Sequence, residues 1–121
     1  MKPALRGKDG ITTIEFALVL GPLLILLTGI VKVGEVMWVQ NALNYAVEEA
    51  ARCGAVNATV CATPGEIQTY AANAAGSGLA ATYTASPQGC GSNVTATYTV
   101  TVSAPFLNFS IPLNANACYP K

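Results

Sequence analysis

Residues 8–32 read KDGITTIEFALVLGPLLILLTGIVK, and the rest of the chain is organised around this stretch. Between Ile11 and Val31 the only charged residue is Glu15. An α-helix needs about 20 mainly apolar residues to cross a hydrocarbon core roughly 30 Å thick. In lipid, a helix also gives every backbone N–H and C=O a partner. We therefore predict one membrane-spanning helical segment over residues 11–32.

The charges that flank this segment predict its orientation. Lys2, Arg6 and Lys8 precede it, against a single acidic residue, Asp9. By the positive-inside rule, the amino terminus stays in the cytoplasm and everything after Lys32 is exported. We expect an inner-membrane protein with its carboxy-terminal part in the periplasm or outside the cell. The apolar run is too long for an ordinary cleaved signal peptide, and no Ala-x-Ala pattern follows it.

All four cysteines lie on the predicted exported side, at Cys53, Cys61, Cys90 and Cys118. An even count in an oxidising compartment predicts two disulfide bonds. Proximity of the predicted elements favours pairing Cys53 with Cys61 and Cys90 with Cys118. Four cysteines allow three connectivities, so the other two stay open at this point.

The helix is predicted to continue beyond the membrane, from about residue 11 to about residue 53, and to end near Gly54. A kink is expected at Gly21 and Pro22, because proline lacks an N–H and crowds the carbonyl four residues back. After Lys32 the pattern becomes amphipathic, because apolar residues recur at spacings of three and four, at Val36, Val39, Leu43, Ala46, Val47 and Ala50. This half of the helix is expected to form the spine of the exported domain.

The remainder predicts a small α+β domain. Thr63, Pro64 and Glu66 have the spacing of a helix start with a capping box, and the helix should run to about Ala75. Strands are predicted over 80–86, 94–104 and 113–119, with a turn over 87–92 and an irregular apolar segment over 105–112.

The strand over 94–104 alternates strictly between apolar residues and threonine or serine. That period of two indicates a sheet with one buried face. The amphipathic half of the long helix is its natural cover. The predicted fold class is α+β, with a long amino-terminal transmembrane helix packed on a small antiparallel sheet.

Composition argues against catalysis and nucleic-acid binding. The chain has 121 residues, no histidine, six basic and six acidic residues, and a net charge of zero. Without histidine, no Ser/His/Asp or Cys/His set is possible, and the commonest metal ligand is missing. The cysteine spacing matches no paired zinc motif, and a neutral chain has no basic footprint for nucleic acid. We expect a structural protein that is not an enzyme and has no metal or cofactor.

Glu15 has two interpretations from the residues alone. It could lie at headgroup level and favour the helix amino terminus through the helix dipole. Alternatively, it could pair with a cation supplied by another subunit. The residues that precede it favour the second interpretation.

Those residues carry a resemblance to a known family. Gly10, followed by residues 11–16 (ITTIEF), resembles the processing site of type IV pilins of the tight-adherence (Flp/Tad) variety. Residues 14–24 (IEFALVLGPLL) are still more similar to TadE-like pseudopilins, whose hallmark is Glu-Phe-Ala before an apolar helix with a proline. Major Flp pilins are much shorter and lack such an exported domain. The chain therefore resembles a minor pilin or pseudopilin with a pilin-like fold.

The resemblance implies specific roles at the amino terminus. Residues 1–10 would be a basic leader without regular structure, 11–32 the membrane half of the helix, and 33–121 the exported domain. A prepilin peptidase would cut between Gly10 and Ile11, and Ile11, Glu15 and Phe16 would serve subunit pairing. Other expected partners are an assembly platform in the inner membrane, and other pilins or further copies of the chain. The alternatives are a major filament subunit and a membrane-tethered adhesion module.

Overall fold

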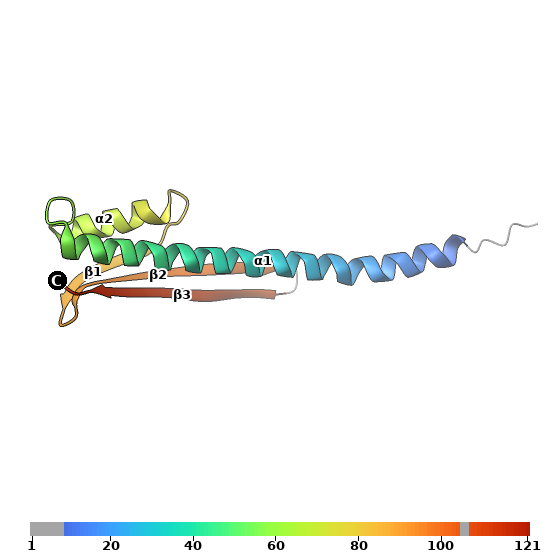
Figure 1. Ribbon diagram of the computed structural model, residues 1–121. Coiled ribbons are helices and arrows are strands. Elements are labelled where there is room, and N and C mark those ends of the chain that lie inside the picture. Colours follow the sequence, from blue (N-terminus) through green and yellow to red (C-terminus); the bar gives the residue numbers. More distant parts are fainter. Residues whose placement is uncertain (1–8, 105–106) are drawn as a thin grey trace, which may run out of the picture. The chain divides into compact units, whose positions relative to one another are not determined.

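The computed structural model describes the backbone of residues 9–104 and 107–121, and the side chains of these ranges from residue 12 onward (Figure 1). The elements follow in the order α1 (Asp9–Val56), α2 (Pro64–Ala75), β1 (Thr82–Gln88), β2 (Gly91–Ala104) and β3 (Leu107–Tyr119). The expected α+β class, with a long apolar helix and a small antiparallel sheet, is confirmed. The chain divides into two compact units, an N-terminal unit up to Gly34 and a C-terminal unit, Glu35–Lys121.

Helix α1 runs from Asp9 to Val56, close to the predicted bounds, and continues without a break through Pro22. Most of the predicted leader, residues 1–8, lies outside the described residues. Asp9 and Gly10 belong to the helix, so the prediction that they lack regular structure is wrong. The first four N–H groups of a helix have no intrahelical partner, so two added residues at this end supply carbonyl acceptors for two N–H groups that would otherwise lack them.

Helix α2 begins with the predicted capping box. The Thr63 hydroxyl accepts a hydrogen bond from the Glu66 N–H at 3.4 Å, and the Glu66 carboxylate accepts one from the Thr63 N–H at 2.9 Å. Pro64 occupies the first turn, where its missing N–H has no consequence. The helix stops at Gly76, which has a φ of 95° that favours glycine. The predicted start and end of this helix are both confirmed.

Replacing Thr63 by alanine should therefore destabilise the protein by about 0.5–2 kcal/mol, the usual effect of losing an N-cap hydroxyl. Unfolding of the full chain in detergent, followed by circular dichroism, measures it. Thr69→Ala is the matched control, because Thr69 is an exposed residue inside the same helix whose hydroxyl bonds the Gly65 carbonyl. Equal stability losses for the two variants would contradict the importance of the cap.

The three strands form one antiparallel sheet in the order β1-β2-β3. Two sequence predictions are wrong here. The turn between β1 and β2 is only Gly89 and Cys90, because the strands pair as far as Gln88 and Gly91. Residues 107–112 are not irregular, because β3 begins at Leu107. Pro112 is compatible with this strand because β3 lies at the edge of the sheet, where a missing N–H need not break a ladder.

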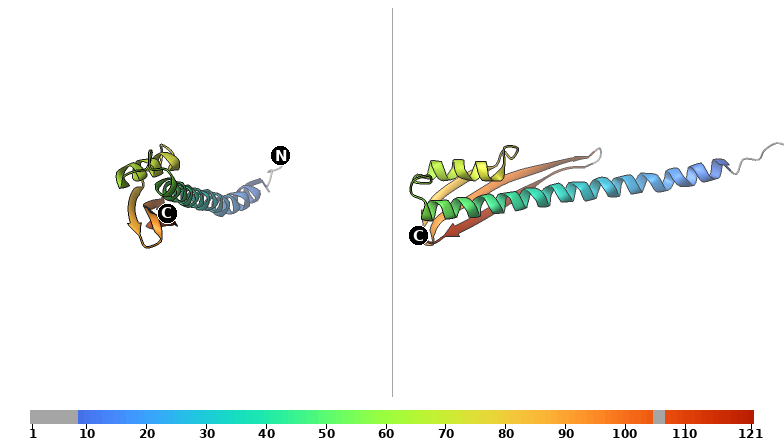
Figure 2. Two further views of the ribbon diagram at one scale, coloured as in Figure 1. Left: turned by 60° about the vertical axis from the view of Figure 1, so that its left-hand side comes forward. Right: turned by 45° about the horizontal axis from the view of Figure 1, so that its top comes forward.

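The core of the C-terminal unit lies between the two helices and one face of the sheet, as the views in Figure 2 show. The predicted cover by the second half of α1 is confirmed, and α2 adds to it. Leu43, Val47 and Val94 are the largest fully buried side chains. Packing is tight near Gly54, where an added Cβ would lie 2.5 Å from the Ser92 Oγ and 2.8 Å from the Ile67 Cδ1. Glycine there leaves room for the end of α1 to approach β2 and α2, and a larger residue would require the Ser92 and Ile67 side chains to shift.

Candidate functional site

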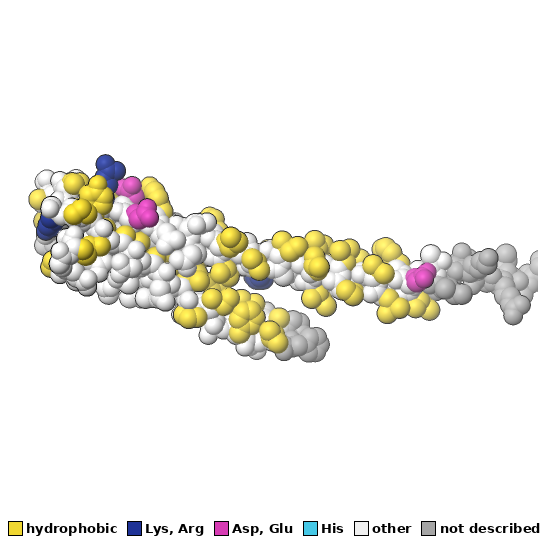
Figure 3. Space-filling view, turned by 60° about the horizontal axis from the view of Figure 1, so that its bottom comes forward, with side chains coloured by type: hydrophobic (Ala, Val, Ile, Leu, Met, Phe, Trp, Pro, Cys, Tyr) yellow, Lys and Arg dark blue, Asp and Glu magenta, His cyan; other side chains and the backbone are white. Residues whose placement is uncertain are grey.

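The apolar surface of the N-terminal unit is its main chemical feature. Every described side chain from residue 12 to residue 34 is exposed. Among them, Leu18 is 70% and Ile25 74% exposed. Figure 3 shows apolar side chains along this part of α1. Among the described residues, α1 is long and apolar enough to cross a membrane, and none of its most apolar window is buried within the protein.

Two polar groups of this segment differ in their hydrogen bonding: the Thr28 hydroxyl and the Leu18 carbonyl. The Thr28 hydroxyl donates to the Leu24 carbonyl at 3.0 Å and to the Ile25 carbonyl at 2.9 Å, so it needs no water. Pro22 offers no N–H to the carbonyl four residues earlier, that of Leu18. Membrane helices tolerate such a group because neighbouring helices can satisfy it. The kink expected at Gly21 and Pro22 stays a prediction.

The residues singled out at the amino terminus lie in the first two turns of α1. Gly10 and Ile11 are in the first turn, and Glu15 follows Ile11 by four residues, one turn further along the helix. Glu15 and Phe16 are both exposed, Phe16 by 67%. A carboxylate and an aromatic ring are thus presented outward at the start of the apolar surface. Their roles in processing and subunit pairing stay predictions.

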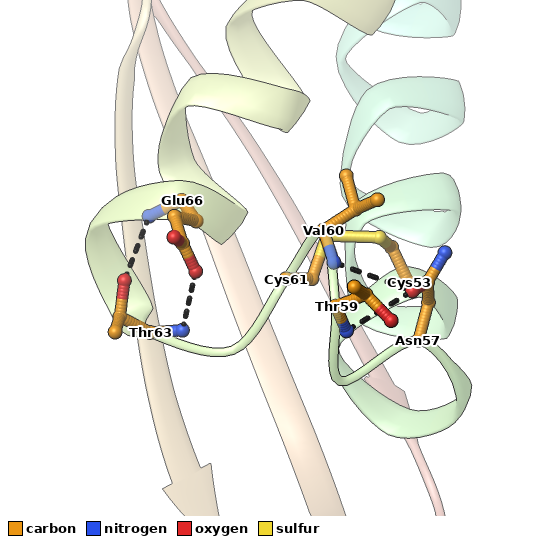
Figure 4. The surroundings of a disulfide bond; sticks show 7 residues. All are labelled: Cys53, Asn57, Thr59, Val60, Cys61, Thr63 and Glu66. Atoms are coloured by element: carbon orange, nitrogen blue, oxygen red, sulfur yellow. Dashed lines mark hydrogen bonds between the residues drawn. A yellow bond between two sulfur atoms is a disulfide. The ribbon is translucent and has the colours of Figure 1, made fainter.

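Two disulfide bonds hold the C-terminal unit, in the pairing that sequence proximity favours. Cys53 at the end of α1 is bonded to Cys61 in the following loop, with their Cα atoms 5.8 Å apart (Figure 4). The Asn57 side-chain oxygen accepts from the N–H groups of Thr59 and Val60 within this loop. A disulfide bond typically stabilises a small domain by about 2–4 kcal/mol. This one also fixes the loop that leads from α1 to α2.

The second bond joins Cys90, in the turn between β1 and β2, to Cys118 near the end of β3, with a Cα separation of 6.3 Å. It ties the two edge strands together at one end of the sheet. Both bonds therefore lie toward the end of the C-terminal unit that contains Val56 and the β1–β2 turn. At the other end, the β2–β3 hairpin has no covalent constraint among its described residues.

The titratable side chains of the C-terminal unit can be compared with the requirements of a metal site and of a buried charge. Within residues 9–104 and 107–121, no group of three or more His, Cys, Asp or Glu side chains is placed to hold a metal ion. Tyr83 lies on the covered face of the sheet, and burial raises the pKa of its hydroxyl. Desolvation disfavours its charged form, so Tyr83 stays protonated at neutral pH and acts as a core residue.

The sequence analysis recognised the segment around Phe109 as apolar but predicted it to be irregular, whereas it forms part of a strand. Leu107, Phe109 and Ile111 alternate with Asn108, Ser110 and Pro112, and structurally they belong to β3. Leu107 is 61% and Phe109 45% exposed. The alternation could have revealed the strand, but Pro112 obscured it.

A long exposed apolar helix followed by a small three-stranded antiparallel sheet is a pilin-like α+β arrangement. The family model described as TadE-like protein matches residues 10–52 of the chain. The resemblance seen around Gly10 and Glu15 is thereby confirmed, and the chain is TadE-like from Gly10 through Arg52. The match covers 43 of the 121 residues, all of them in α1. No curated protein and no solved structure matches the chain.

Proposed function

We propose that the chain is a pseudopilin or minor pilin that acts structurally in the assembly of a tight-adherence pilus. The observation that carries this proposal is the TadE-like match, which begins at Gly10 and includes Glu15 and the whole exposed apolar segment. On this proposal, residues 1–10 are a leader, 11–32 span the inner membrane with the amino terminus in the cytoplasm, and 33–121 are exported.

A prepilin peptidase would hydrolyse the peptide bond between Gly10 and Ile11. The new α-amino group of Ile11 would carry a positive charge at the start of the apolar segment. Glu15 of a neighbouring subunit would then pair with this cation. Two charges in a low-dielectric environment are far more stable together than apart, so the pair would set the register of one subunit against the next. Phe16 would pack beside it.

The partners would be the peptidase, the assembly platform of the inner membrane, and other pilins or further copies of the chain. None of these roles requires catalysis by the chain itself. Support comes from the exposed apolar surface of residues 12–34, which needs either lipid or neighbouring helices around it.

The test is mass spectrometry of the amino-terminal peptide, on sheared extracellular material and on membranes of the native host. A chain that begins at Ile11 in the sheared fraction would identify a processed subunit of the fibre. A chain that begins at Ile11 only in membranes would identify a processed assembly factor. A chain that keeps Met1–Gly10 in both fractions would overturn the roles given to Gly10, Ile11 and Glu15.

A further inference from the structure

The covered face of the sheet becomes exposed toward the end of the β2–β3 hairpin where Ala104 pairs with Leu107. Along β2, Val94 and Ala96 are fully buried, whereas Val100 and Val102 are only half-buried. Along β3, exposure rises in the same direction, through residues that lie on the same face: Ala115 4%, Leu113 8%, Phe109 45% and Leu107 61%. We call the side chains of Val100, Val102, Leu107, Phe109 and Ile111 the end patch.

The strand register makes the end patch one continuous surface. Val100 is paired with Ile111, and Val102 with Phe109, so these side chains meet across the two strands on the same face. Ala104 and Leu107 extend the row by one more pair. Figure 3 shows apolar side chains gathered on this hairpin.

The end patch lies at the end of the C-terminal unit where the chain comes in from the apolar segment. Gly54 packs beside Ser92, so the end of α1 lies at the β1–β2 turn. Further back along α1, the Gln40 side chain donates to the Asn114 carbonyl at 3.0 Å. Two contacts therefore align α1 with the hairpin, so Glu35 and the Ala104–Leu107 pair lie toward the same end of the C-terminal unit.

From the Gln40–Asn114 contact, the strand extends further than the helix does before it reaches Glu35, the first residue of this unit. From Gln40 back to Glu35 the helix rises roughly 8 Å. From Asn114 back to Leu107 the strand rises roughly 24 Å. Because Glu35 directly follows the apolar segment in the chain, a bilayer that holds that segment lies within a few residues of Glu35.

The chemistry of the hairpin suits a lipid surface. Residues 67–120 contain no charged side chain, although soluble proteins commonly use charges to protect exposed strand edges. The opposite face of the hairpin presents small hydroxyl and amide groups, at Thr99, Thr101, Ser103, Asn108 and Ser110. An apolar face opposite an uncharged polar face matches the boundary between acyl chains and headgroups.

We propose that the end patch rests on the bilayer surface and gives the C-terminal unit a second contact with lipid, in addition to the membrane helix. This inference rests on the membrane span of the proposed function. Strand edges with unpaired backbone groups are not stable in hydrocarbon. The end patch therefore lies among headgroups and upper acyl chains, with its polar face toward water.

The test places a single fluorophore on each face of the hairpin in the full chain. Trp38, the one tryptophan, is 65% exposed and is first replaced by phenylalanine. In that background, Phe109→Trp reports on the end patch, and Ser110→Trp, the next residue on the opposite face, is the matched control. Both proteins are reconstituted into phosphatidylcholine vesicles, with and without bromine on the acyl chains. We expect blue-shifted emission and strong bromine quenching at position 109, and little of either at position 110.

The design separates the possible failures. The inference would be overturned if an aqueous quencher still reached position 109 in a chain that resists carbonate extraction. The membrane span would stand in that case. A blue shift that fades on dilution of protein in lipid, without bromine quenching, would mean that a second copy covers the end patch, which also overturns the inference. A chain that carbonate extracts would overturn the span and this inference with it. Circular dichroism of both variants checks that the sheet is formed.

Discussion

Replacing Glu15 by alanine is expected to lower the incorporation of the chain into pili by at least about tenfold, while its insertion into the membrane stays unchanged. Removing one partner of a charge pair in a low-dielectric site generally costs about 3–5 kcal/mol, and each 1.4 kcal/mol is a factor of ten in an equilibrium. Glu15 lies at the start of the apolar surface, exposed and available to a neighbour. Insertion should persist because the variant only removes a charge from an apolar segment.

The measurement compares the amount of the chain in sheared pili with the amount in membranes. Glu48→Ala is the matched control, because Glu48 is an exposed carboxylate on the same helix, but in the C-terminal unit. If the processed chain stays in the membrane as an assembly factor, the readout becomes the number of pili per cell. Wild-type values for the Glu15 variant in both readouts would exclude the pairing role.

Replacing Gly91 by alanine should destabilise the C-terminal unit by roughly 2–4 kcal/mol, from backbone strain and overpacking together. Gly91 opens β2 with a φ of 126°, a conformation that side chains other than glycine rarely adopt. An added Cβ would collide with the Tyr119 carbonyl oxygen and would lie 2.8 Å from the Pro120 Cα. These are backbone atoms held in place by the adjacent disulfide, Cys90–Cys118, so they cannot easily move aside.

Gly89→Ala provides the control from the same turn. Gly89 lies two residues earlier, and an added Cβ there meets nothing within 4 Å. Urea unfolding of the oxidised full chain in detergent should separate the two variants, and free-thiol titration should show whether Cys90 still pairs. Similar midpoints for Gly89→Ala and Gly91→Ala would mean that the close approach of the carboxy-terminal residues to β2 does not stabilise the fold.

The amino-terminal half of this protein could be derived from its sequence because its determinants are local. A continuous apolar run with charges on both sides specifies a helix whatever its neighbours are. The stripe that follows Lys32 marks which side of the helix meets a sheet. The capping box at Thr63 and Glu66 involves residues only three apart, so it too was visible before the structure. The signature around Gly10 and Glu15 belongs to the same class of local pattern.

The tertiary structure decided what depends on pairing between distant residues. Residues 107–112 become a strand because β2 supplies a partner for them, and Pro112 is compatible with it only because β3 is at the edge. The sequence left three disulfide connectivities open, because a sulfur–sulfur bond requires proximity in space. The need for glycine at Gly91 follows from its positive φ and from the close approach of the Tyr119 and Pro120 backbone. The end patch could be identified only from the structure, in which the helices cover just part of the sheet face. The alternation of apolar and polar residues predicts an apolar face, but it does not predict how much of that face the helices bury.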